Sequence, residues 1–168
     1  MRLLSPRDKG IYLYECENIS KEEFIINLFK EKINKMPIAQ NVLITNKETS
    51  SEELQAFLNR AILCQYETLF VIEINKSFSK NQQIIMDNYI DKLLAYKKEK
   101  YKEKQNNIYK KNIEQYLDTC IAFIYDKKDE NNLVFLKELK KFNIKKNDEF
   151  KIERKDLELN KENIYIIS

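Results

Sequence analysis

The chain has 168 residues, of which 43% are hydrophobic and 34% charged, with a net charge of +3. This length suffices for one domain with one core but is short for two, and the mixture of charges implies no strong field for a polyanion. Histidine is absent, which excludes Ser-His and Cys-His nucleophile pairs and an imidazole general base.

Three cysteines are scattered along the chain without C-x-x-C spacing: Cys16, Cys64 and Cys120. They cannot supply the four ligands of a structural zinc site, so we expect reduced, buried thiols and no metal.

No apolar run approaches the roughly 20 residues of a membrane helix, and the first ten residues lack the apolar part of a secretory signal. We therefore expect a cytoplasmic protein with no membrane span, in which residues 1–168 form a single domain.

Strand-like and helix-like patterns alternate along the chain. Short apolar runs predict strands at 11–15, 41–46, 68–74 and 119–126, and a closing strand at 163–168.

Between the strands, serine and threonine residues mark predicted helix starts at Ser20, at Thr49 to Ser51 and at Ser77 or Ser79, and a fourth helix is predicted over 131–142. Helical spacing predicts the buried stripe of each of the first three helices. The stripes are Phe24, Ile25, Leu28, Phe29, Lys32 and Ile33; then Leu54, Phe57, Leu58, Ala61, Ile62 and Tyr66; then Ile85, Tyr89, Leu93 and Tyr96.

Strands that are apolar on both faces need helices on both sides. This pattern predicts a three-layer α/β sandwich with a mainly parallel, five-stranded sheet. Such folds bind ligands at the carboxyl ends of their strands. The residues expected there are 16–21, 46–49, 73–75 and 125–127.

The segment "GIYLYECENISKEEF" has the strand, loop and helix order of a phosphate-binding loop. Glu15 and Ser20 stand where G-x-x-x-x-G-K has its glycines, and Lys21 stands at the lysine. Such a loop needs glycine because its amides must curl around phosphate without interfering side chains. The only glycine, Gly10, precedes the strand. We therefore expect no working phosphate loop here.

The strand "LFVIEIN" also matches the position of a nucleotide-hydrolase motif but lacks one of its functional residues. Glu73 stands where a nucleotide hydrolase places a magnesium-binding acid, but Ile74 stands where an AAA+ ATPase has its catalytic glutamate. Two motif positions therefore indicate a P-loop NTPase or AAA+-like fold that lacks the working residues. The degenerate nucleotide-binding positions are Glu15, Ser20, Lys21 and Glu73, and no catalytic residue is predicted.

Lysines and tyrosines are interleaved over residues 96–116. This pattern is compatible with binding of single-stranded nucleic acid through stacking and charge. Lysine without clustered arginine is a weak signal of this kind, so we favour a charged helical extension or loop and consider nucleic acid unlikely.

The segments "PIAQNVLITNKETSSEE" and "RAILCQYETLFVIEIN" resemble mysterin-type proteins, the giant AAA+ E3 ubiquitin ligases that carry a ring finger. The likeness spans about residues 10–145. It implies an AAA+-like core with strand order 5-1-4-3-2, in a family where some ATPase units are degenerate, and it implies ubiquitin transfer and zinc elsewhere in those proteins. The ring finger and intact nucleotide motifs are missing from this chain, so only the scaffold role carries over.

The sequence thus predicts a non-hydrolysing AAA+-like structural or interaction module without a cofactor, whose partners are other AAA+ units or other proteins. One alternative is a nucleotide-binding or ATP-hydrolysing unit that uses ATP and Mg, with Lys21, Glu73 and a partner chain. The other is single-stranded nucleic-acid binding through residues 96–116.

Overall fold

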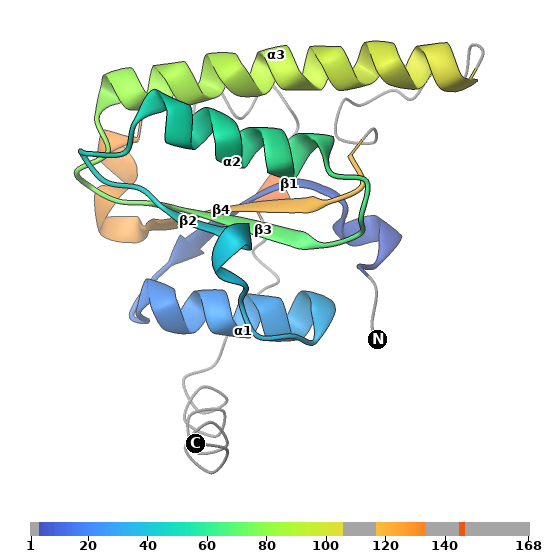
Figure 1. The fold of residues 1–168 in the computed structure, drawn as a ribbon. Coiled ribbons are helices and arrows are strands. Elements are labelled where there is room, and N and C mark those ends of the chain that lie inside the picture. Colours follow the sequence, from blue (N-terminus) through green and yellow to red (C-terminus); the bar gives the residue numbers. More distant parts are fainter. Residues whose placement is uncertain (1–3, 106–116, 134–144, 147–168) are drawn as a thin grey trace.

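The computed structural model describes residues 4–105, 117–133 and 145–146. It shows an α/β fold with a parallel sheet between two helical layers (Figure 1). Its strands are β1 (Gly10–Cys16), β2 (Val42–Ile44), β3 (Leu69–Ile74), β4 (Cys120–Asp126) and the two-residue β5 (Lys145–Lys146). Its α-helices are α1 (Lys21–Ile33), α2 (Ser51–Leu63) and α3 (Lys80–Gln105), and short 3-10 helices cover Pro6–Asp8, Ala39–Asn41 and Lys127–Asn132.

The sheet order is β2-β3-β4-β1-β5, and every recorded strand pair is parallel. From the other edge the four longer strands run β1-β4-β3-β2, as the order 5-1-4-3-2 places them. The neighbour of β1 at the edge is β5, in which Lys145 and Lys146 pair with Tyr12 and Leu13. The closing strand predicted at 163–168 lies outside the described residues.

Two apolar cores lie on opposite faces of the sheet, because successive side chains of a strand point to opposite faces. In β4, Ile121, Phe123 and Tyr125 join the core beneath α2 and α3. The alternate residues Cys120, Ala122 and Ile124 join the core beneath α1. Figure 1 shows this division for the described α-helices, with α1 on one face and α2 and α3 together on the opposite face. The sandwich predicted from strands apolar on both faces is thereby confirmed in its layers.

Serine residues fix the helix starts as predicted. The Ser20 and Ser50 hydroxyls accept hydrogen bonds from the amides of Glu23 and Glu53 at the starts of α1 and α2. At α3 the cap is reciprocal. Ser79 Oγ accepts a hydrogen bond from the backbone N–H of Gln82, and Gln82 Oε1 accepts one from the backbone N–H of Ser79. Each cap satisfies amides that have no partner within the helix.

The predicted stripe of α3 is wrong in part. Ile85 is 42% exposed and Tyr96 is 52% exposed, whereas the buried apolar residues are Met86, Ile90, Leu93 and Leu94. Apolar residues at adjacent positions of α3 allow two helical rows, and packing against α2 and the sheet selects the row one position further along. The prediction that Tyr66 belongs to the buried stripe of α2 is also wrong. Helix α2 ends at Leu63, so Tyr66 lies in the following loop and is 82% exposed.

The remaining differences concern element length. The strand predicted at 41–46 covers only Val42–Ile44 in the structure. A 3-10 helix occupies Ala39–Asn41 before it, and after it the Thr45 hydroxyl accepts a hydrogen bond from the Asn75 amide beyond β3. The third helix continues to Gln105, so the first part of the segment 96–116 is helical and extends beyond α2 (Figure 1). Of the helix predicted over 131–142, the first two residues belong to the 3-10 helix Lys127–Asn132, and residues 134–142 lie outside the described residues.

Candidate functional site

The candidate site lies at the carboxyl ends of β1, β3 and β4. Parallel pairing brings these ends together, with Cys16 beside Asp126 and with Glu73 beside Ile124 in the register. Helix α1 begins over the same edge, because only the residues 17–20 separate it from β1. The backbone of these strands therefore delivers acidic and thiol side chains to the amino terminus of a helix.

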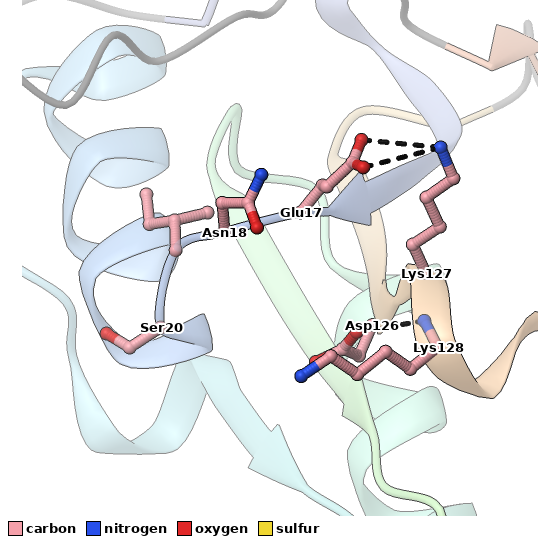
Figure 2. A pocket seen from close by; sticks show the side chains of 7 residues that line it. Glu17, Asn18, Ser20, Asp126, Lys127 and Lys128 are labelled. Carbon is pink, nitrogen blue, oxygen red and sulfur yellow. Dashed lines mark hydrogen bonds and ion pairs between the residues drawn. The ribbon is translucent and has the colours of Figure 1, made fainter.

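The β1–α1 loop borders an open pocket of about 420 Å³ (Figure 2). Asn18 adopts a left-handed conformation, φ 60°, which asparagine tolerates better than most residues. The next turn brings Ser20 to the start of α1, where its hydroxyl caps the helix. The pocket is lined by Glu17, Asn18, Ile19, Ser20, Asp126, Lys127 and Lys128.

An ion pair at the edge of this pocket joins the β1–α1 loop to the 3-10 turn that follows β4. Lys127 Nζ lies 3.4 Å from Glu17 Oε2 (Figure 2). Both side chains are more than half exposed, so the pair contributes little to stability. The Lys128 amide donates to Asp126 Oδ1 and fixes the turn after β4.

Lys21 and Glu73, two of the four predicted positions, form a buried ion pair. Lys21 Nζ lies 3.1 Å from Glu73 Oε1, and the side chains are 15% and 5% exposed. Lys21 comes from the first turn of α1 and Glu73 from the strand β3, which lies between β2 and β4. The second carboxylate oxygen, Glu73 Oε2, is buried and has no hydrogen-bond partner among the described residues.

Glu15 and Ser20 do not join this pair. Glu15 Oε1 accepts a hydrogen bond from the Tyr125 hydroxyl at 3.2 Å, and Tyr125 belongs to the core beneath α2 and α3. Ser20 instead lines the pocket and caps α1. The structure therefore brings Lys21 and Glu73 together and gives the other two residues separate local partners.

Cys16 is a member of the site that the motif positions do not include. Its thiol is 1% exposed, and burial raises its pKa to about 12. The Lys21 ammonium acts in the opposite direction, whereas the carboxylates of Asp126, Glu73 and Glu15 raise the pKa further. Cys16 is therefore a neutral thiol at physiological pH, and its position at the end of an apolar strand was the signal in the sequence.

The side chains around this loop differ from those of a phosphate-binding loop that holds a magnesium nucleotide. Amides that cradle phosphate need bare backbone, but Glu15 and Ser20 carry side chains at the two glycine positions, and Gly10, with φ 124°, lies at the opposite end of β1. Lys21, the one matching cation, is already paired with a carboxylate. In the described part of the chain, no group of three or more Cys, Asp or Glu side chains is placed to hold a metal ion.

The described part of the lysine and tyrosine segment includes a cation–π contact. Lys100 Nζ lies 5.7 Å from the centroid of the Tyr96 ring, one helical turn earlier. Such a contact covers one face of an aromatic ring. Residues 106–116 of the segment lie outside the described residues.

Comparison with models of protein families, with curated proteins and with solved structures found no match to the chain. Among the residues that the structure describes, no helix is both long enough and apolar enough to cross a membrane.

Proposed function

We propose that the chain is a non-hydrolysing AAA+-like module that acts as a structural or interaction element. The resemblance to mysterin-type ligases suggests the context of a degenerate unit within an ATPase array. Its partners would be other AAA+ units or other proteins, and its compartment the cytoplasm. The order of the four longer strands supports this proposal, since it agrees with the order that the resemblance implies.

The observation that carries the proposal is the Lys21–Glu73 ion pair. A phosphate-binding lysine must direct its ammonium at the ligand, but Lys21 directs it at an internal carboxylate 3.1 Å away. The two charges neutralise each other where they are almost removed from solvent. The site thus satisfies its own charge without a triphosphate.

The geometry also favours one second candidate, a nucleotide-binding unit completed by a partner chain. That candidate requires a lysine at the start of α1 close to an acid at the end of β3, and Lys21 and Glu73 are placed in this way. It would need the ion pair to open and the loop around Ser20 to rearrange, because the Ser20 side chain occupies the helix start.

Titration of ATP with magnesium into the purified chain distinguishes the two candidates. The proposed module gives no saturable heat and no rise in melting temperature. A nucleotide at one hundred times its dissociation constant would add about 2.7 kcal/mol to the free energy of unfolding, so binding of moderate affinity would be visible. The Lys21→Met variant is the matched control, since a true nucleotide signal would disappear in it.

A further inference from the structure

The burial of Glu73 is not explained by packing. The residue is 4% exposed, and Leu69 and Val71 on the same face of β3 are fully buried apolar residues. One carboxylate oxygen has no hydrogen-bond partner among the described residues. A buried carboxylate with one unsatisfied oxygen costs free energy that an apolar side chain would not. The interaction recorded for the carboxylate is the ion pair with Lys21.

The partner that Glu73 neutralises occupies a place suited to an anion. Lys21 is the first residue of the 13-residue helix α1, whose amino terminus carries a partial positive charge. An ammonium and a helix start together favour binding of a phosphate-like oxyanion. The pocket that Ser20 lines lies at the helix start and is open to solvent.

We infer that Glu73 is a built-in counter-anion, an autoinhibitory contact that holds the Lys21 site closed to small oxyanions. The inference rests on the proposed function, because it assumes that the intact chain binds no phosphate compound. It identifies Glu73, rather than the missing glycines alone, as the group that closes the site. Removing the carboxylate leaves the Lys21 ammonium buried without its partner, and an external oxyanion then takes the vacated place.

Inorganic phosphate is the probe. Melting temperatures of the wild type and the Glu73→Ala variant are compared in sodium phosphate and in sodium chloride at equal ionic strength. Phosphate at ten times its dissociation constant shifts the folding equilibrium about 11-fold, so phosphate raises the melting temperature of the variant by more than the general salt effect seen in the wild type. Saturable binding of phosphate to the variant by calorimetry accompanies the shift.

Two control variants separate this effect from general salt stabilisation. Glu67→Ala removes the acid of another ion pair, Lys9–Glu67, and should gain no more stability from phosphate than the wild type does. The double variant Lys21→Met with Glu73→Ala lacks the ammonium and should also gain no more than the wild type. An extra phosphate stabilisation that persists in the double variant would overturn the assignment of the site to Lys21.

The remaining outcomes are also decisive. If Glu73→Ala gains no stability from phosphate, or stays unfolded even in phosphate, Glu73 is not a replaceable counter-anion, while the proposed function stands. If the wild type itself binds phosphate saturably, the site is not closed, and the inference and the proposed function both fail.

Discussion

The Lys21 ammonium lies 3.1 Å from the Glu73 carboxylate, and the two side chains are among the least exposed charged groups at the carboxyl edge of the sheet. A buried pair of this kind adds little net stability compared with apolar residues, yet removal of one partner leaves an uncompensated charge in the interior. The pair is therefore better understood through what each charge does to the other.

The first prediction concerns the cost of breaking this pair. Lys21→Met should lower the free energy of unfolding by about 3–5 kcal/mol, because Glu73 is left buried without its cation. The double variant Lys21→Met with Glu73→Leu should recover much of the loss, since both charges are then absent. Urea denaturation of the wild type, of Lys21→Met, of Glu73→Leu and of the double variant measures the coupling. A loss in the double variant equal to the sum of the two single losses would show that the two side chains do not interact.

Lys97 is predicted to hold the carboxyl end of α2. Its Nζ lies 2.7 Å from the Ile62 carbonyl oxygen and 3.4 Å from that of Cys64, with Asp118 Oδ2 at 3.7 Å. Lys97→Met should destabilise the protein by about 1–3 kcal/mol, because charge-assisted hydrogen bonds to partly buried carbonyl oxygens are lost. The neighbouring Lys98→Met is the control and should change stability by less than about 0.5 kcal/mol. A similar effect of both substitutions would refute the specific role of Lys97.

Gln82 is predicted to fasten the loop after β2 to the start of α3. Its amide group donates to the carbonyls of Asn46 and Thr49 at 3.1 and 2.7 Å, and its oxygen caps the Ser79 amide. Gln82→Ala should cost about 1–2 kcal/mol in thermal or urea unfolding. It should also accelerate amide hydrogen exchange in residues 46–49. The exposed Asn81→Ala should have neither effect, and unchanged exchange in the Gln82 variant would contradict the proposed link.

The buried thiols predict how stability depends on alkaline pH. Burial raises the pKa of both Cys16 and Cys120 to about 12, from an ordinary value of 9.0. The unfolded chain therefore releases these protons at lower pH than the folded chain, and the stability that they contribute below pH 9 is lost as pH rises from about 9 to 12. The double variant Cys16→Ala with Cys120→Ala should show a shallower decline over this range. Parallel curves for wild type and variant would show that the thiols are not protected by burial.

Thiol labelling gives a separate prediction at neutral pH. Cys16 and Cys120 are almost completely buried, whereas Cys64 is only partly buried and its sulfur exchanges hydrogen bonds with the Tyr66 backbone. A thiol reagent should therefore modify Cys64 first, and the other two only on unfolding. Mass spectrometry of the labelled peptides checks the order, and rapid labelling of Cys16 in the folded protein would contradict it.

Much of the fold could be predicted from local signals. Serine or threonine positions marked the starts of the three described α-helices, with the exact capping residue left open for α2 and α3. Apolar runs marked four strands, because capping and strand burial depend on neighbouring residues. The row of α3 that faces the core could not be predicted, since residues 84–86 and 93–94 give it apolar side chains in two rows. The choice between Ile85 and Met86 depends on where α2 lies, which only tertiary packing determines.

For the candidate site too, the sequence predicted the positions of residues but not their side-chain contacts. The motif spacing identified Lys21 and Glu73 as separate positions, and parallel topology implied that both lie at one edge of the sheet. That they bond each other, and that one oxygen of Glu73 lacks a partner, depends on side-chain directions that spacing does not specify. Glu15 was placed in the same group by spacing, but its hydrogen bond is with Tyr125 and not with Lys21.

A crystal structure of the chain grown with ATP and magnesium would examine the closed site itself. We predict that Lys21 Nζ stays against Glu73 Oε1 and that no triphosphate density lies between Cys16 and Lys21. Density for phosphates at that place, with the lysine turned away from Glu73 toward them, would show that the chain has kept a nucleotide site.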